Sequence, residues 1–161
     1  MAESLVSIVA KVAISSDLKT VWNALTKPST LKHWFLRHAN LDLKVGGSYH
    51  FSWGTRNSSG EYPVNMRGKY LKLESERLLQ LTWNTEDRPV TFQLDSNETE
   101  TILTVIVEGF EPGSPGHIFE LRGWTFYLIN LKTVLEKGWD LRELHSDRTL
   151  LDGWVNYYSL R

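Results

Sequence analysis

From residue 41 to residue 107 the sequence repeats one pattern, in which apolar side chains occupy every second position of short segments separated by turn residues. In residues 48–53, tyrosine, phenylalanine and tryptophan alternate with serine and histidine, so one face is aromatic and the other polar. This period of two is typical of a β-strand with one buried face. Residues 41–45 are expected to enter a two-residue hairpin at Gly46-Gly47. With residues 6–14, the pattern predicts six to seven strands in an antiparallel sheet.

Helical spacing occurs on both sides of this run of strands. A helix is expected over residues 18–25, after an N-cap signal at Asp17, and a second short helix is expected to start near Pro28 and to carry Leu31, Trp34 and Phe35. Residues 121–137 form the longest apolar repeat at spacings of three and four, closed by a glycine at 138. The loop at residues 111–116, with two prolines and two glycines, is expected to lack regular structure. The order of elements predicts an α+β fold.

Composition excludes several classes of function. The chain has 161 residues, the length of one domain, and no cysteine, which excludes thiol nucleophiles, Cys-ligated zinc, iron–sulfur clusters and disulfides. A net charge of −1 argues against nucleic acid as a partner. The N-terminus lacks a basic region followed by an apolar one, and no uninterrupted apolar run approaches 18 residues. We therefore expect a cytoplasmic protein without a membrane span.

The near-zero net charge is distributed unevenly along the chain. Residues 1–80 hold 11 basic and 6 acidic side chains, and residues 81–161 hold 7 basic and 13 acidic ones. The simpler interpretation is two mixed surfaces on one domain, and the alternative is a charged face that docks a partner protein.

Motifs for metal binding, phosphate binding and nucleophilic catalysis are absent from the sequence. His33 and His38 lie five residues apart, which is not the spacing that places two ligands on one helical face, and no Gly-x-Ser-x-Gly motif or phosphate-binding glycine loop occurs. We expect no metal, no cofactor and no defined catalytic residue. A cyclase-type enzyme would need a buried acid or base facing a cavity; the candidates are Glu74, Glu108, Glu120, Arg67 and Arg122, although such residues are more often solvated.

The aromatic face of the sheet needs a cover, and the long helix is the element available for it. The inward-facing positions are large and rigid, and two interpretations follow: a filled core, or a core that leaves an apolar pocket for a small organic ligand. These positions are Tyr49, Phe51, Trp53, Met66, Trp83 and Phe92.

Several short motifs together resemble a known family. They are VWNALTKP at residues 21–28, Leu31 with Trp34-Phe35, DLKVGGSY at 42–49, LTW at 81–83, Gly109-Phe110, and Gly123-Trp124 at the start of the long helix. In order and spacing they resemble the Aha-type heat-shock ATPase activator-like family, part of the START-like, helix-grip superfamily of polyketide cyclases, birch-pollen-allergen-type proteins and lipid-transfer domains. The resemblance implies a curved antiparallel sheet gripping a C-terminal helix, with two short helices after the first strand.

The resemblance also implies three functions, in order of preference. The first is binding of a small hydrophobic or aromatic ligand between sheet and helix, the second is stimulation of a heat-shock chaperone ATPase, and the third is a cyclase- or hydrolase-type enzyme. We expect residues 1–140 to form the helix-grip domain and residues 141–161 an extension that packs on it or on a partner subunit, in a monomer or homodimer. The expected ligand-binding residues are Trp34, Phe35, Tyr49, Phe51, Trp53, Met66, Trp83, Phe92, Phe110, Arg122, Trp124 and Leu128.

Overall fold

The computed structural model describes residues 4–54, 56–83 and 88–142. These residues form one seven-stranded sheet in the order β1-β7-β6-β5-β4-β3-β2, with every neighbouring pair antiparallel. The strands are β1 (Val6–Ile14), β2 (His38–Leu41), β3 (Ser48–Trp53), β4 (Val64–Glu74), β5 (Leu78–Trp83), β6 (Arg88–Ser96) and β7 (Thr101–Phe110). The predicted antiparallel sheet is confirmed, at the upper end of the expected strand number.

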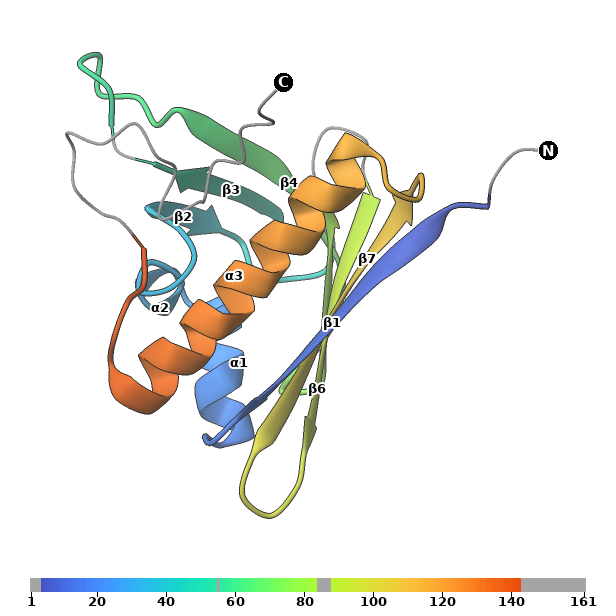
Figure 1. Cartoon of the computed structure of the whole chain (residues 1–161). Helices are drawn as coiled ribbons and strands as arrows, with labels where there is room; N and C mark the ends of the chain where they lie inside the picture. Colours follow the sequence, from blue (N-terminus) through green and yellow to red (C-terminus); the bar gives the residue numbers. More distant parts are fainter. Residues whose placement is uncertain (1–3, 55, 84–87, 143–161) are drawn as a thin grey trace.

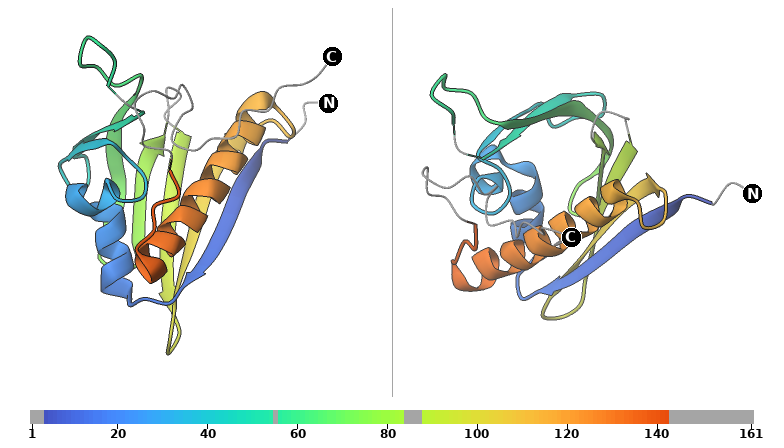
Figure 2. Two further views of the ribbon diagram at one scale, coloured as in Figure 1. Left: turned by 60° about the vertical axis from the view of Figure 1, so that its left-hand side comes forward. Right: turned by 45° about the horizontal axis from the view of Figure 1, so that its top comes forward.

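Three helices accompany the sheet: α1 (Leu18–Thr26), α2 (Pro28–Leu31) and α3 (Pro115–Lys137). Asp17 caps α1 as predicted, because its carboxylate accepts a hydrogen bond from the Thr20 amide at 2.7 Å. Figure 1 shows α3 crossing the sheet diagonally, and the two views of Figure 2 show the sheet curling around the side on which all three helices lie. The α+β, helix-grip architecture predicted from the sequence is confirmed.

Three predicted boundaries are wrong, and the first lies at a pair of glycines. The Gly46-Gly47 pair does not form a two-residue hairpin, because β2 ends at Leu41 and a loop follows it. The Gly46 amide donates to the Tyr70 carbonyl at 2.8 Å, and the Tyr70 amide donates to the Gly47 carbonyl at 2.9 Å. The loop thus pairs with β4. A Cβ at Gly47 would lie 2.0 Å from the Asp42 carbonyl oxygen, so the close approach requires glycine.

The second wrong boundary is the start of the long helix. It begins at Pro115, six residues before the predicted start, because Ser114 is its N-cap and accepts a hydrogen bond from the His117 amide at 3.2 Å. Proline is favoured at the first position of a helix, where its missing N–H costs nothing. The third wrong boundary is the end of the short helix α2, which was expected to carry Trp34 and Phe35. The helix ends at Leu31, and Trp34 and Phe35 lie in the turn that follows it.

The core occupies the concave side of the sheet. Tyr49, Phe51 and Trp53 on β3 are all buried, as their alternation predicts. Gly68 on β4 lies opposite Tyr49, and a Cβ there would come within 2.6 Å of the tyrosine ring. The glycine therefore lets the Tyr49 ring lie flat across β4.

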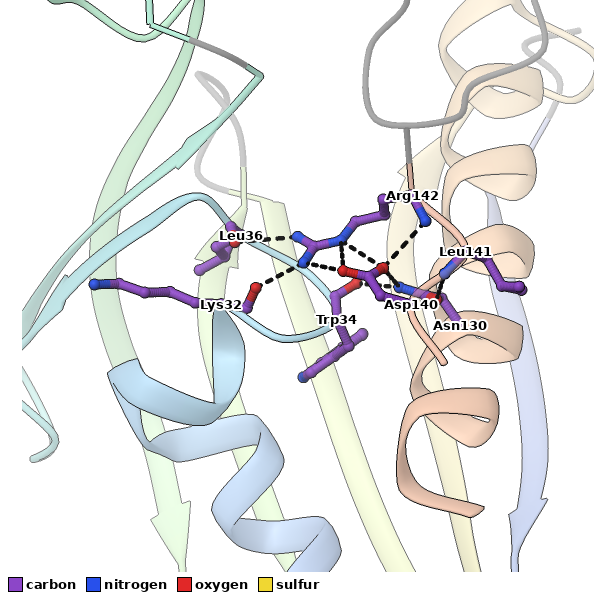
Figure 3. A network of polar contacts seen from close by, with 7 residues as sticks. All are labelled: Lys32, Trp34, Leu36, Asn130, Asp140, Leu141 and Arg142. Carbon is purple, nitrogen blue, oxygen red and sulfur yellow. Dashed lines mark hydrogen bonds and ion pairs between the residues drawn. The ribbon is translucent and has the colours of Figure 1, made fainter. Parts of the chain in front are cut away.

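A polar network fastens the residues after α3 to the turn after α2 (Figure 3). The guanidinium of Arg142, whose side chain is 1% exposed, pairs with Asp140 at 2.7 Å. It also donates to the carbonyls of Leu36 at 3.1 Å and Lys32 at 2.6 Å. The buried amide of Asn130 donates to Asp140 at 3.0 Å and to the Trp34 carbonyl at 2.7 Å. We call this network, Asn130, Asp140 and Arg142, the C-terminal clamp.

The clamp includes Arg142, the second residue of the expected C-terminal extension. Residues 143–161, on which the rest of that expectation falls, lie outside the described residues. The division at residue 140 stays a prediction.

Candidate functional site

Phe35 is the centre of an aromatic cluster between the sheet and α3. Its ring lies 6.1 Å from Trp83 on β5 and 4.8 Å from Tyr127 on α3, measured between ring centroids. Trp53 on β3 and Trp124 on α3 are also neighbours, at 5.4 and 5.6 Å. Stacked, tilted and edge-on pairs all occur here, so the planar rings meet at several angles and do not fill the space between them completely.

The carboxylate of Glu120 lies within this cluster. Its oxygens accept hydrogen bonds from the indole N–H of Trp124 at 3.0 Å and from that of Trp83 at 3.2 Å. Burial raises the pKa of Glu120, while the two indole donors and the charge of Arg88 oppose that rise. The indoles therefore hold the carboxylate in one orientation in surroundings that are otherwise apolar.

The cluster encloses a pocket of about 120 Å³ between the N-terminal half of α3 and strands β3 to β5. Its lining is Phe35, Trp53, Val64, Met66, Trp83, Phe119, Glu120, Gly123, Trp124 and Tyr127. Val64 and Phe119 are exposed and form its rim, whereas the four residues Phe35, Trp53, Trp83 and Trp124 are buried. An apolar cavity of about 150 Å³ in another protein binds benzene, so this pocket has room for about one aromatic ring.

A second, smaller space lies deeper, between the sheet and helices α1 and α2. Its volume is about 10 Å³, and its lining is Leu25, Leu31, Trp34, Phe35, Phe51, Tyr70, Leu79, Leu81, Trp83 and Phe92. Phe35 and Trp83 line both spaces. The sequence left two interpretations of the aromatic face open, a filled core and a core with an apolar pocket. The core is almost filled beside α1 and α2, and it leaves a pocket beside α3.

The structure brings some of the expected ligand-binding residues to the pocket and leaves others away from it. Phe35, Trp53, Met66, Trp83 and Trp124 line it. Trp34, Phe51 and Phe92 line the deeper space instead. The remaining expected residues, which line neither space, are Tyr49, Phe110, Arg122 and Leu128. The Tyr49 hydroxyl donates to the Thr82 carbonyl at 2.6 Å, and the Phe110 ring lies under the Arg88 guanidinium. Leu128 is buried and Arg122 is half-buried.

Sequence reasoning did not place Val64, Phe119, Gly123 or Tyr127 in the lining. A signal for the helical members was present, because Glu120, Trp124 and Tyr127 are spaced by four and three residues and share one face of α3. From the sequence, Glu120 was one of several candidates for a buried acid or base facing a cavity. Val64 and Phe119 carry no such signal, since they are apolar residues at the exposed ends of a strand and a helix.

The described residues offer little to a metal ion. No group of three or more His, Asp or Glu side chains among them could hold one. His38 and His50 are neighbours on β2 and β3, with ring centroids 6.0 Å apart, but His50 is hydrogen-bonded to Asn65 at 3.1 Å. None of the helices within the described ranges combines the length and apolarity needed to cross a membrane.

Chemically, the pocket favours a neutral apolar group. An anion would be repelled by Glu120, whose carboxylate already resides in an apolar setting. Glu120 and Tyr127 are the ionisable side chains in the pocket lining, so any general acid–base role of a cyclase- or hydrolase-type enzyme would fall to one of them.

Comparison with known proteins identifies relatives of this fold. Residues 16–136 match the family model described as Activator of Hsp90 ATPase homolog 1-like protein. No curated protein matches the chain.

Solved structures of similar shape come from several bacteria. The chain is 20% identical to the protein described as the Aha1 dimer from Colwellia psychrerythraea, with a TM-score of 0.71 over 83% of this chain and 98% of that one. It is also 20% identical to the protein SSP2350 from Staphylococcus saprophyticus, with a TM-score of 0.70 over 83% and 93% of the two chains. The AHSA1-like protein from Aeromonas hydrophila gives 20% identity and a TM-score of 0.67 over 83% and 94%. These likenesses concern the fold.

Proposed function

The chain belongs to the family of Activator of Hsp90 ATPase homolog 1-like proteins, and we propose that it binds a small, neutral, apolar or aromatic ligand in the pocket between α3 and strands β3 to β5. One observation supports this most directly: a preformed pocket of about 120 Å³ is lined by six aromatic side chains and one half-buried carboxylate. A cluster this rich in aromatics could close on itself, and the space it leaves open costs dispersion energy that a ligand would restore.

Gly123 provides a direct test, because it lines the pocket and has no side chain. Gly123→Leu is expected to place an isobutyl group in the pocket and to displace the ligand. The probe is toluene, a neutral molecule with a single aromatic ring, and its binding is followed by isothermal titration. Its titration should give saturable binding to the wild-type chain and at least tenfold weaker binding to Gly123→Leu, since a side chain of four carbons occupies most of a site of this size.

The matched control lies on the same helix. Gly116 is in the first turn of α3, and a Cβ there would meet no atom within 4 Å. Gly116→Leu should therefore bind the probe as the wild type does. No saturable binding to the wild type, or equal binding to wild type and Gly123→Leu, would contradict the proposed ligand site.

The family description supports a second candidate function, stimulation of a heat-shock chaperone ATPase. The uneven distribution of charge, with an excess of basic residues in the first half of the chain, suits docking to a partner protein. The test is the steady-state ATPase rate of a purified ninety-kilodalton heat-shock chaperone with increasing amounts of this chain. The docking hypothesis predicts a saturable rise that Gly123→Leu retains, and a rate that does not change at any ratio would exclude it.

A further inference from the structure

Tyr70 is a buried tyrosine without a hydrogen-bond partner. It lies on β4, is 1% exposed, and its hydroxyl has no partner among the described residues. Its neighbour Tyr49, whose ring centroid lies 6.0 Å away, donates its own hydroxyl to the Thr82 carbonyl at 2.6 Å. A buried polar group left without a partner is destabilising, and most such groups in proteins are paired. Phenylalanine would fill the same place without this cost.

The Tyr70 side chain lines the small space behind the pocket. The other polar side-chain groups of that lining are engaged: the indole of Trp34 donates to the Ala24 carbonyl at 2.9 Å, and that of Trp83 donates to Glu120. A water molecule would need two to four polar partners and a volume of at least about 10 to 15 Å³. The space has about 10 Å³ and one available hydroxyl, so it suits a water molecule poorly.

The pocket and this deeper space share two lining residues, Phe35 and Trp83, and we infer that these rings separate them. The Trp83 ring is fixed by its bonds to Glu120, whereas Phe35 has no polar group and lies in a turn outside any helix or strand. Rotation of the Phe35 ring is therefore the movement that joins the two spaces into one elongated cavity along the concave face of the sheet.

From these contacts we propose that Tyr70 is the inner polar contact of the ligand site. The ligand is elongated and apolar, with a neutral oxygen such as a ketone, ether or hydroxyl at its leading end. Its apolar body occupies the pocket beside Trp53 and Trp124, and its oxygen passes Phe35 to accept a hydrogen bond from the Tyr70 hydroxyl. This rests on the proposed function, and it adds the ligand class and the residue that selects it.

The test uses two ligands of nearly equal shape. Acetophenone carries a ketone oxygen on a single aromatic ring, and isopropylbenzene has a methyl group in place of that oxygen. Dissociation constants of both are measured by isothermal titration for the wild type and for Tyr70→Phe. The ratio of the two constants in the wild type, divided by the same ratio in the variant, isolates the hydrogen bond to the hydroxyl. We expect this quotient to favour the ketone about tenfold, as a hydrogen bond to an otherwise unpartnered buried group should.

Tyr49→Phe is the matched control. It also removes one hydroxyl from the aromatic face, but that hydroxyl already donates to Thr82, so the ketone preference should stay at its wild-type value. Tyr70→Phe should also fold with a melting temperature no lower than that of the wild type, because it removes an unpartnered group.

The outcomes separate the two proposals. If both ligands bind but the ketone preference survives Tyr70→Phe, the inference about Tyr70 is overturned and the pocket stands. If the wild type shows no preference beyond that of Tyr70→Phe, the same conclusion follows. If neither ligand binds the wild type, the proposed ligand site itself fails, and the role of Tyr70 fails with it.

Discussion

Glu120 determines the polarity of the pocket. It lies one turn before Trp124 on α3, and the indole N–H groups of Trp124 and Trp83 are its hydrogen-bond donors. Neither donor carries a charge, and the charge of Arg88 adds to the stabilisation that their dipoles provide. This explains why the pKa of Glu120 is raised in spite of its hydrogen bonds: the loss of solvation outweighs them.

The raised pKa of Glu120 predicts how this residue affects stability at different pH values. The folded state binds the proton more tightly than the unfolded chain, so the contribution of Glu120 to the free energy of unfolding is most favourable at low pH. It falls as the pH rises from the ordinary glutamate pKa of 4.5 through the raised value. The free energy of unfolding of the wild type, minus that of Glu120→Gln, should therefore decrease between pH 4 and pH 8 in urea titrations followed by tryptophan fluorescence.

Glu136 provides a control of opposite sign. The bond from Lys132 and the bond from the Ser15 amide lower its pKa, so its contribution is present at neutral pH and is lost on acidification. The free energy of unfolding of the wild type, minus that of Glu136→Gln, should therefore increase with pH. Parallel curves for the two variants would contradict the burial of Glu120 as the cause of its raised pKa.

For single residues, the sequence predicted which types of side chain line the pocket better than it predicted which positions do. Tyr49, Phe51 and Trp53 share one face of β3, and alternation identifies that face correctly. Of these three, only Trp53 lines the pocket, since Phe51 lines the deeper space and the Tyr49 hydroxyl is bonded to the Thr82 carbonyl. Periodicity identifies a face, whereas the crossing point of a helix depends on packing across the whole sheet.

The C-terminal part of helix α3 is held by two sets of contacts. Lys132 donates to the Ala13 carbonyl at 2.6 Å, which ties the helix to the end of β1, and the C-terminal clamp ties the residues after it to the turn that carries Phe35. Because Phe35 also contacts Tyr127 on α3, the clamp helps to fix the separation between the pocket wall and the helix.

Loss of the clamp arginine should be strongly destabilising. Arg142→Ala leaves the Asp140 carboxylate without its cation and the carbonyls of Leu36 and Lys32 without a donor. Breaking a buried pair in this way costs about 3–5 kcal/mol, measurable as a fall in the free energy of unfolding in urea. Arg77→Ala is the matched control, because the pair of Arg77 with Glu74 is exposed and should contribute at most about 1 kcal/mol. Equal losses in the two variants would contradict the structural role of the clamp.

Helices and strands were predicted well where one sequence signal dominated, and less well where two signals indicated different structures. Strands with strict alternation and the helix capped by Asp17 appear where expected. The start of α3 was missed because Pro115 and Gly116 were interpreted as helix breakers, although Ser114 caps a helix there. The clamp gave no sequence signal at all, since Asn130, Asp140 and Arg142 are ordinary polar residues until the fold brings the turn after α2 beside them.

The pocket as a whole is a property of the complete fold. Its walls come from the turn after α2, from β3, β4 and β5, and from α3, so its lining spans residues 35 to 127 of the sequence. No short segment contains it, and an unfolded chain has no equivalent site. A ligand of the pocket must therefore bind the folded state alone, and this joins the proposed function to the stability of the molecule.

This linkage gives the last prediction. A ligand at one hundred times its dissociation constant should raise the free energy of unfolding by about 2.7 kcal/mol, and by about 4.1 kcal/mol at one thousand times. With acetophenone, the urea midpoint of the wild type should rise with the logarithm of ligand concentration. Gly123→Leu, whose side chain fills the site, should keep a constant midpoint, and Gly116→Leu should follow the wild type. If the urea midpoint rises equally in all three chains, the ligand stabilises the fold by binding elsewhere. That result would contradict the pocket as the binding site.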